Sequence, residues 1–362
     1  MKKIDIRTKS RSYKVIVGKN NISKFASELS DIEGKKLFLI DKNVFLLHKS
    51  KLTEMINKSD DRITFIFHST EKNKSLSSVK NIYDTLVKNR FSRNDSIIAI
   101  GGGIVGDVSG FAAATYMRGI NFYQLPTTLL SMVDSSVGGK TGINYSNIKN
   151  IIGSFYQPQK VYVDTSFLST LPYPEIVSGS GEIFKYAFLS DDDNYKFIRE
   201  ELRKILTQNY FDENLIARCI ELKASVVEND EQEKTGLRKV LNLGHTFAHA
   251  FESSLNFRIK HGEAVIAGIF ASLIVSEKTG LISKNELNKF IIEFYYLPLN
   301  KKILTADKDV IIKFMKSDKK SISGNINLVL VRKPGELFID FPVSERIIKY
   351  ALQRLFEIIR TV

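Results

Sequence analysis

The stretch that decides the fold runs from Ser96 to Asn150 and reads SIIAIGGGIVGDVSGFAAATYMRGINFYQLPTTLLSMVDSSVGGKTGINYSNIKN. Its first five residues are a short apolar run, typical of a strand buried on both faces of a parallel sheet. Gly101, Gly103 and Gly106 then match the pattern G-x-G-x-x-G. In that pattern the turn is tight, the backbone approaches a pyrophosphate closely, and a helix N-terminus offers free N–H groups. The stretch therefore predicts a dinucleotide-type phosphate turn.

The acid that usually accompanies this turn about twenty residues later is absent, because Arg118 to Gln124 carries no carboxylate. Asp107, directly after the turn, is the nearest candidate. The glycines can also serve only to pack a helix close to a strand, and the pattern alone leaves both interpretations open. Further along, a second glycine pair precedes Lys140, which predicts a cationic site for an acidic substrate.

Length and composition indicate a globular protein of two domains. The chain has 362 residues, which is long for one hydrophobic core, and it is 43% hydrophobic and 26% charged. No apolar run reaches the roughly eighteen residues of a membrane span, so we expect no membrane partner. The single cysteine, Cys219, excludes an intrachain disulfide and is typical of a reducing compartment. We therefore expect a cytoplasmic protein with a buried structural thiol.

The formal net charge of +13 raises the question of nucleic-acid binding. The lysines are spread along the whole chain, however, and no block of five basic residues occurs. Phenylalanine and tyrosine lie mostly inside apolar runs, where core packing is the default. We therefore expect no nucleic-acid partner, while the excess charge can still attract acidic small molecules.

The N-terminal half alternates strands with helices, which indicates a parallel sheet with helical crossovers. The expected strands are an edge strand within residues 1–18 and the segments 36–41, 62–67, 96–100, 122–125 and 160–164. The expected helices there are 77–89 and the segment from the glycine turn to residue 116. Long amphipathic patterns follow at 194–208, 212–229, 243–255, 262–279, 284–294 and 307–316. Two prolines at 172 and 174 mark the boundary, so we expect an α/β domain over 1–172 and an all-helical domain over 173–362.

Three of the five histidines lie close together in the second half, at His245, His249 and His261. Neutral imidazole is a common metal ligand, and residues four apart share one face of a helix, so the simplest interpretation makes His245 and His249 both ligands. The metalloprotease pattern needs a glutamate after the first histidine, where this chain has Thr246. Metal binding and ordinary surface or core histidines both remain open at this point.

Glu182 is the carboxylate that would complete a three-ligand site. It follows small residues in SGSGEIFK (178–185), which we interpret as a helix start, and Lys185 lies one turn further on. Two histidines and one glutamate would leave an open metal position for a substrate oxygen. Alternatively, Glu182 only stabilises the positive end of the helix dipole.

Eight segments, in a fixed order over most of the chain, resemble the 3-dehydroquinate synthase family, the sugar-phosphate cyclases of the shikimate pathway. A glycine turn is shared with many enzymes, but the combination of VDSSVGGKTGIN with LNLGHTFAH is highly specific. The matching segments are GGGIVGDVSGF (101–111), YMRGI (116–120), LPTTLLSMVDSSVGGKTGIN (125–144), KNIIGSF (149–155), SGSGEIFKYA (178–187), LRKVLNLGHTFAHAFE (237–252), HGEAV (261–265) and SDKK (317–320).

The resemblance implies a Rossmann-like N-terminal domain, a helical C-terminal domain and an active site in the cleft between them. It also implies a homodimer that holds one NAD and one divalent metal per chain, zinc or cobalt. The implied substrate is 3-deoxy-D-arabino-heptulosonate 7-phosphate. Its C5 hydroxyl is oxidised, phosphate is eliminated, the C5 ketone is reduced again, and the opened enol closes by intramolecular aldol addition. NAD is regenerated in each turnover.

The resemblance assigns the metal to Glu182, His245 and His261, which corrects the simple pairing of histidines four apart. His249 becomes a substrate-side group that assists proton removal from the C5 hydroxyl. The substrate carries a phosphate and a carboxylate, so cations and hydrogen-bonding side chains are expected around it. The matching residues are Arg118, Asp134, Lys140, Asn150, Lys185, Lys223, Arg238 and Asn242.

On the cofactor side, Asp41 stands at the end of a strand and suits ribose hydroxyls, so the missing acid precedes the glycine turn. The cofactor residues that the resemblance implies are Asp41, Asn43, Glu71, Lys74, Gly103, Ile104, Val105, Gly106, Asp107, Thr127, Thr128, Lys140, Lys149, Phe167 and Thr170. The chain departs from the family pattern by one extra residue between Lys223 and Arg238, and its C-terminal substrate lysine is either Lys319 or Lys320.

Two related enzyme classes share this apparatus. A sister cyclase would act on another sugar phosphate, such as sedoheptulose 7-phosphate or glucose 6-phosphate. Lys223, Arg238 and Asn242 together favour a carboxylated substrate instead. A metal-dependent polyol dehydrogenase shares the fold, but it would release NADH and would need fewer phosphate-binding cations.

Overall fold

The computed structural model describes residues 1–146, 148–317 and 326–361. The chain divides into two compact units: unit 1 is Met1–Leu171 with Ile216–Gln232, and unit 2 is Pro172–Leu215 with Glu233–Val362. The expected boundary after residue 172 did not anticipate that Ile216–Gln232 belongs to unit 1.

Hydrogen bonds to the first strands explain this assignment. The backbone N–H of Arg7 donates to Glu228 at 2.6 Å, and the N–H of Ser10 donates to Glu231 at 3.1 Å. The side chain of Gln157 donates to the same glutamate at 2.9 Å. Contacts between residues more than two hundred positions apart leave no local sequence signal. The sequence therefore predicted one domain boundary and two continuous domains.

Unit 1 is built on a seven-stranded sheet of order β1-β2-β9-β6-β5-β3-β4. Only β1 is antiparallel to its neighbour, and the remaining pairs are parallel. The expected edge strand within residues 1–18 is in fact two strands, because a turn from Thr8 to Arg11 reverses the chain. The strands are β1 (Lys2–Arg7), β2 (Ser12–Gly18), β3 (Lys36–Asp41), β4 (Arg62–Phe67), β5 (Ser96–Gly101), β6 (Asn121–Pro126) and β9 (Lys160–Asp164).

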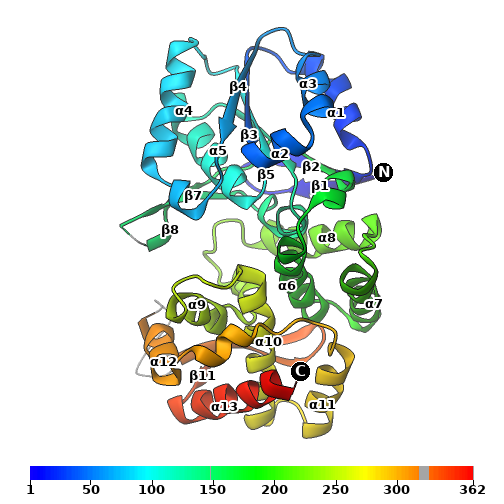
Figure 1. Ribbon diagram of the computed structural model, residues 1–362, viewed down its shortest axis with the longest axis vertical. Helices are drawn as coiled ribbons and strands as arrows, with labels where there is room; N and C mark the ends of the chain where they lie inside the picture. Colours follow the sequence, from blue (N-terminus) through cyan, green and yellow to red (C-terminus); the bar gives the residue numbers. More distant parts are fainter. Residues whose placement is uncertain (147, 318–325, 362) are drawn as a thin grey trace. The chain divides into compact units, whose positions relative to one another are not determined.

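Helices cover both faces of this sheet, with α4 and α5 on one side and α1 and α3 on the other (Figure 1). The helices of unit 1 are α1 (Asn21–Glu28), α2 (Lys42–Leu47), α3 (Lys49–Ile56), α4 (Leu76–Lys88), α5 (Gly103–Thr115) and most of α8 (Glu213–Asn229). The short 3₁₀ helices are η1 (Leu29–Asp31), η2 (Glu71–Asn73), η3 (Tyr116–Arg118) and η5 (Thr165–Thr170), and η4 (Ser131–Ser135) is a short π-helix. Cys219 on α8 is buried, as expected of a structural thiol.

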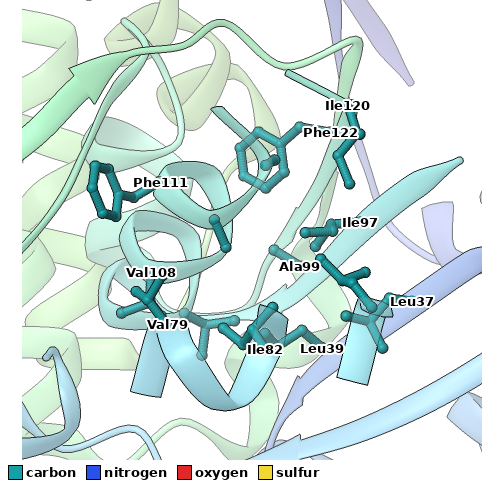
Figure 2. Close-up of a cluster of buried hydrophobic side chains, with 14 of the residues drawn as sticks. Leu37, Leu39, Val79, Ile82, Ile97, Ala99, Val108, Phe111, Ile120 and Phe122 are labelled. Carbon is teal, nitrogen blue, oxygen red and sulfur yellow. The ribbon is translucent and has the colours of Figure 1, made fainter. Parts of the chain in front are cut away.

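Alternate strand residues form the core under α4 and α5. Leu37 and Leu39 of β3 and Ile97 and Ala99 of β5 point to one face, because side chains on a strand alternate between faces. They pack against α4 residues such as Val79 (Figure 2). Burial of this layer, at about 25 cal/mol per Å² of apolar surface, holds the carboxyl ends of β3 and β5 in place.

A two-stranded hairpin, β7 (Lys140–Tyr145) and β8 (Ile148–Phe155), lies against α5 and was not expected from the sequence. Its side chains are mostly exposed on β8, so the segment lacks the hydrophobic periodicity from which strands are predicted.

Unit 2 is mainly helical but contains one hairpin, so the prediction of an all-helical domain was wrong. Its helices are α6 (Tyr173–Leu189), α7 (Asp192–Gln208), α9 (His245–Ser254), α10 (His261–Lys278), α11 (Lys284–Glu293), α12 (Lys308–Ser317) and α13 (Glu345–Thr361), with turns η6 (Leu237–Asn242) and η7 (Lys301–Thr305). The hairpin is β10 (Ile326–Lys333) and β11 (Glu336–Val343). A short apolar run such as β10 cannot be distinguished from a helical segment by periodicity alone.

Glycines bring α6 and α9 into backbone contact with α10. A methyl group built on Gly262 would lie 1.8 Å from the carbonyl oxygen of Ser178 on α6, and one on Gly181 would lie 2.3 Å from the carbonyl oxygen of Gly262. A methyl group on Gly268 would lie 2.2 Å from the carbonyl oxygen of Gly244, which precedes α9 with φ of +77°. The three helices are therefore closer together than any side chain would permit.

We expect Gly262→Ala to destabilise the protein by about 3 kcal/mol or more, because the added methyl group must push two helix backbones apart. Urea unfolding followed by circular dichroism measures the loss. Glu277→Ala, near the other end of α10, is the matched control and should change stability by less than about 0.5 kcal/mol. Equal stability of the two variants would contradict the close contact.

Glu28 at the end of α1 links that helix to β9. Lys160 Nζ lies 2.6 Å from its Oε2, and the hydroxyl of Tyr162 donates to the same oxygen. Burial raises the pKa of Glu28, but the hydrogen bonds from Lys160 and Tyr162 outweigh burial and lower the pKa to about 2. The ionised carboxylate therefore stabilises the folded state.

We expect Glu28→Gln to lower the free energy of unfolding at pH 7 by about 1–3 kcal/mol. Because the pKa is lower in the folded state, this contribution is complete above pH 4.5 and disappears as the pH falls toward 2. Urea midpoints of the wild type and the variant should therefore converge between pH 5 and pH 2. Asp84→Asn, which breaks the exposed Lys80–Asp84 pair, serves as the control and should have little effect at any pH.

Candidate functional site

Unit 2 carries a group of three side chains whose donor atoms converge. Glu182 comes from the middle of α6, while His245 and His261 are the first residues of α9 and α10. Oε1 of Glu182 lies 3.5 Å from Nε2 of His245 and 3.3 Å from Nε2 of His261. The ligand atoms all lie within 4.8 Å of one another. Two imidazole nitrogens and one carboxylate oxygen are the donor set of a catalytic zinc site with an open position.

The structure corrects the expectation that Glu182 stands at a helix start. Pro172 and Pro174 place the beginning of α6 at Tyr173, and the glycines before Glu182 lie inside the helix, where Gly181 contacts α10. Glu182 is only 1% exposed and is too far from the helix N-terminus to stabilise its dipole. The interpretation of Glu182 as a capping residue is therefore excluded.

Each histidine of this group has its second nitrogen oriented by an acceptor. Nδ1 of His245 lies 3.1 Å from the carbonyl oxygen of Leu243, and Nδ1 of His261 lies 3.2 Å from Oε2 of Glu252. When each ring is neutral and carries its one proton on Nδ1, both Nε2 atoms face Glu182 with a free lone pair, as metal binding requires.

Electrostatics favour a cation beside Glu182. Burial raises the pKa of Glu182, but Lys185 and His245 outweigh burial and hold this pKa well below its usual range. Burial lowers the pKa of His245. Burial also acts to lower the pKa of His261, but the hydrogen bonds of His261 to Glu182 and Glu252 outweigh it and raise this pKa to about 10. Without metal, His261 is therefore protonated at neutral pH. A metal ion bound here would replace that proton.

His249 lies next to this group and not within it. Its ring centre is 5.6 Å from that of His245 and 6.2 Å from that of His261. Its side chain is exposed, unlike that of Glu182. This position suits a group that exchanges protons with a bound molecule.

Two further cations of unit 2 are buried. Lys185 is 2% exposed and forms an ion pair with Glu182 one turn earlier on α6. Arg238 on η6 is also 2% exposed, and Asn242 ends the same turn, just before α9. A buried guanidinium offers a rigid pair of donors for an oxyanion.

In unit 1 the carboxyl ends of β3, β5 and β6 meet at one edge of the sheet, because these strands are adjacent and parallel. Asp41 ends β3, Gly101 ends β5, and Thr127 follows β6 with its N–H donating to the Gly101 carbonyl at 3.0 Å. Ligands of open α/β sheets bind at this edge. The hydroxyl of Thr127 is buried and finds no hydrogen-bond partner among the described residues.

Asp41 is 7% exposed, and its carboxylate accepts hydrogen bonds from neighbouring residues. The N–H of Val44 donates to it at 2.9 Å, which caps α2, and the hydroxyl of Ser69 also donates to it. Burial raises the pKa of Asp41, and only part of this rise is offset by the N–H groups of Val44 and Asn43. Hydroxyl donors of a ligand would add to this partly satisfied carboxylate.

After the turn, α5 begins at Gly103 as expected. The side chain of Val105 belongs to the hydrophobic cluster, and Ile104 packs against that cluster. These two residues can therefore meet a phosphate only through their backbone N–H groups. Gly106 lies so close to β6 that a methyl group there would be 2.9 Å from Oε1 of Gln124. The third glycine of the pattern thus serves helix packing.

Three predicted residues gather around Lys74, which was itself predicted. Lys74 is 5% exposed, and its ammonium group donates to Asp107 and to Asn150. Burial raises the pKa of Asp107, and Lys74 partly offsets that rise. Glu71 accepts a hydrogen bond from Asn144 at 2.8 Å, and Asn144 in turn accepts the N–H of Asn150 at 2.9 Å.

A second pair links predicted substrate residues. Lys223 on α8 is 6% exposed, and its Nζ lies 2.9 Å from Oδ2 and 2.8 Å from the backbone oxygen of Asp134. The extra residue between Lys223 and Arg238 leaves this lysine on α8, next to the other predicted groups of unit 1.

The remaining predicted residues have more varied surroundings. Arg118 is exposed in a turn where it and Met117 have φ values of 65° and 49°. Lys140 begins β7, and Lys149 lies on β8. The hydroxyl oxygens of Thr128 and Ser131 are hydrogen-bonded to each other at 2.9 Å. Asn43 lies on α2, where its side chain is exposed. Phe167 and Thr170 both contact His48. The ring centres of Phe167 and His48 lie 4.9 Å apart, and the hydroxyl oxygen of Thr170 lies 2.8 Å from Nε2 of His48.

Sequence reasoning missed Ser69, Asn144 and Glu252, which contact predicted site residues. Asn144 and Glu252 stand at the ends of quoted motifs, so the motifs contained them, but their roles depend on contacts that spacing does not show. Lys319 and Lys320 lie outside the described residues. No helix in the described ranges is both long and apolar enough to span a membrane.

Known protein families and relatives match most of the chain. A family model described as 3-dehydroquinate synthase N-terminal matches residues 64–178, and one described as 3-dehydroquinate synthase C-terminal matches residues 179–321. The 3-dehydroquinate synthase of Pelagibacter ubique is 40% identical over 97% of this chain and 98% of its own length. That of Legionella pneumophila strain Philadelphia 1 is 39% identical over 98% and 96%.

Solved structures show the same fold. A 2-deoxy-scyllo-inosose synthase, complexed with carbaglucose-6-phosphate, NAD⁺ and Co²⁺, has a TM-score of 0.88 at 25% identity and covers 98% of this chain and 100% of its own. A 2-epi-5-epi-valiolone synthase from Streptomyces hygroscopicus, with NAD⁺ and Zn²⁺ bound, has a TM-score of 0.87 at 24% identity, over 97% and 98%. With both family models matched and relatives aligned over almost their whole length, this chain belongs to the 3-dehydroquinate synthase family.

Proposed function

We propose that this protein converts 3-deoxy-D-arabino-heptulosonate 7-phosphate to 3-dehydroquinate and phosphate. The observation that carries the proposal is the converging group of Glu182, His245 and His261 in a member of this family. Two histidines and a carboxylate can hold a metal ion, and the exposed His249 lies beside them. This arrangement suits reversible chemistry at a carbon that bears a hydroxyl group.

The residues present fit a divalent metal ion. Glu182, His245 and His261 would hold it, because their donor atoms converge and the neighbouring acceptors leave both Nε2 atoms unprotonated when metal is bound. Zinc and cobalt both accept such ligands. When bound, the ion supplies Lewis acidity toward a substrate oxygen. Lys185 balances the charge of Glu182 and keeps it ionised.

The carboxyl edge of the sheet in unit 1 fits NAD. A dinucleotide can satisfy the carboxylate of Asp41, the N-terminus of α5 and the hydroxyl of Thr127, which has no hydrogen-bond partner in the described part of the chain. The cofactor supplies reversible hydride transfer when bound. Asp41 would bind ribose hydroxyls, and the N–H groups after Gly102 would bind the pyrophosphate.

Charge decides how the substrate is held. Its phosphate and carboxylate need cations, which Arg118, Lys140, Lys185 and Arg238 would provide. Asn150 and Asn242 would donate hydrogen bonds, and Lys223 with Asp134 would orient the hydroxyl-bearing rim. His249 would accept the proton of the C5 hydroxyl, because its exposed imidazole ring lies beside the metal group.

A homodimer located in the cytosol is part of this proposal. Its support is the resemblance to the family and the single, buried cysteine, which needs no oxidising compartment. Sedimentation of the purified protein at micromolar concentration tests the dimer.

A sister cyclase is the second candidate, favoured by the fold shared with 2-deoxy-scyllo-inosose synthase. A polyol dehydrogenase is the third. The three candidates differ in products: phosphate from different sugar phosphates in the first two, and accumulating NADH in the third.

We expect steady phosphate release from 3-deoxy-D-arabino-heptulosonate 7-phosphate when NAD and Zn²⁺ are present, without accumulation of NADH. A chelator should abolish the release, and added Zn²⁺ or Co²⁺ should restore it. Phosphate is measured by a coupled assay while absorbance at the NADH band is followed.

Sedoheptulose 7-phosphate and glucose 6-phosphate are the matched controls and should yield phosphate at least about a hundredfold more slowly, because a site built for a carboxylate leaves its cations unpaired with them. Turnover of either control at the higher rate would assign the chain to a sister cyclase. Accumulating NADH would indicate a dehydrogenase.

Two variants separate the cofactor site from the metal site. We expect Asp41→Asn to weaken NAD binding about tenfold, because a charge-assisted hydrogen bond is lost while asparagine still caps α2. Its metal affinity should be unchanged. Glu182→Gln should show the reverse: metal affinity is lost and NAD affinity is retained. Fluorescence titration and chelator competition measure the two affinities, and a loss of both in either variant would contradict separate sites.

A further inference from the structure

Glu252 is a buried carboxylate of α9 that stands beside the candidate metal group. It is 5% exposed, and its Oε2 lies 3.2 Å from Nδ1 of His261. The other nitrogen of that ring, Nε2, lies 3.3 Å from Oε1 of Glu182. The imidazole of His261 is therefore held between two carboxylates, one on each nitrogen.

The two candidate histidine ligands differ in the group that holds them. The acceptor for His245 is the neutral carbonyl of Leu243, while the acceptor for His261 is a carboxylate. A carboxylate is the stronger acceptor, and a hydrogen bond to it makes the opposite ring nitrogen a better metal ligand. Both histidines begin their helices, so no preceding helical turn restrains either ring. The orientation of His261 therefore depends on its contact with the Glu252 carboxylate.

We propose that Glu252 is a positioning residue for the metal centre: it fixes the tautomer and the ring orientation of His261, so that Nε2 points at the ion. This inference rests on the proposed function, because it takes Glu182, His245 and His261 as the ligands. Glu252 itself does not touch the ion or the substrate.

A second grouping of donor atoms makes another arrangement conceivable. His249, Glu252 and His261 also have ligand atoms within 4.8 Å of one another. A second ion there would use Nδ1 of His261 while Nε2 holds the first, which requires an imidazole stripped of both protons. The hydrogen bond to Glu252 requires no such deprotonation, so we infer one ion per chain.

The test measures Zn²⁺ affinity and stoichiometry by competition with a chromophoric chelator. The proteins are the full-length wild type, Glu252→Gln, Glu252→Leu and the control Glu201→Gln. Glu201 is a buried glutamate of α7 at 7% exposure, and α7 contributes no residue to either donor group. Glutamine still accepts the Nδ1–H, whereas leucine cannot. We therefore expect one ion in the wild type, about tenfold weaker binding in Glu252→Gln and up to about a hundredfold weaker binding in Glu252→Leu.

Two further readouts separate positioning from general destabilisation. The visible spectrum of the Co²⁺-loaded protein should change in both Glu252 variants and stay unchanged in Glu201→Gln, because it reports ligand geometry. Thermal unfolding of the metal-free proteins shows whether each variant folds. If the leucine variant does not fold, the near-isosteric glutamine variant decides the question.

Wild-type affinity and spectrum in a folded Glu252→Gln would overturn the inference. The inference would also be overturned if the wild type bound two ions and Glu252→Gln bound one, because Glu252 would then be a metal ligand. If the wild type binds an ion that Glu182→Gln binds equally well, the ligand assignment under the proposed function fails instead, and this outcome is distinct from the other two.

Discussion

The backbone contact of α6 and α9 with α10 is the constraint on which the chemistry of unit 2 depends. Each candidate metal ligand is the sequence neighbour of a glycine in that contact: Glu182 follows Gly181, His245 follows Gly244, and His261 precedes Gly262. Because the helix axes cannot move apart without losing these contacts, the three donor atoms keep a spacing suited to one ion. Glycine, which is usually unfavourable inside helices, is here what allows them to approach.

Buried charges in both units occur next to opposite charges. Lys185 pairs with Glu182, Lys74 with Asp107, and Lys223 with Asp134. Such pairs contribute little net stability, because removing two charges from water costs about as much as their attraction returns. Strongly shifted pKa values also cluster at functional sites. The concentration of these pairs among residues predicted for the site is therefore better explained by binding than by folding.

Regular elements were predictable where local periodicity is strong. The buried runs of β3 and β5 and the amphipathic pattern of α4 were expected within a residue of where they occur. The hairpin β7–β8 was missed because the side chains of β8 are largely exposed, and β10–β11 because a short apolar run suits a helix as well as a strand. The start of α6 was misplaced because glycines that normally interrupt a helix are used here for contact.

By itself, the sequence determined the fold class, the family and the residue types available for catalysis, because spacing and glycine patterns are local properties of the chain. The local pattern around Glu182 left open whether it caps a helix or faces the histidines, and only the family resemblance assigned it to the metal; neither gave a role to Glu252. The tertiary structure shows Glu182 beside both histidines and Glu252 beside His261, and each contact depends on which side chains meet across different helices. Contacts of this kind arise from packing between distant segments, and packing has no signature in local sequence.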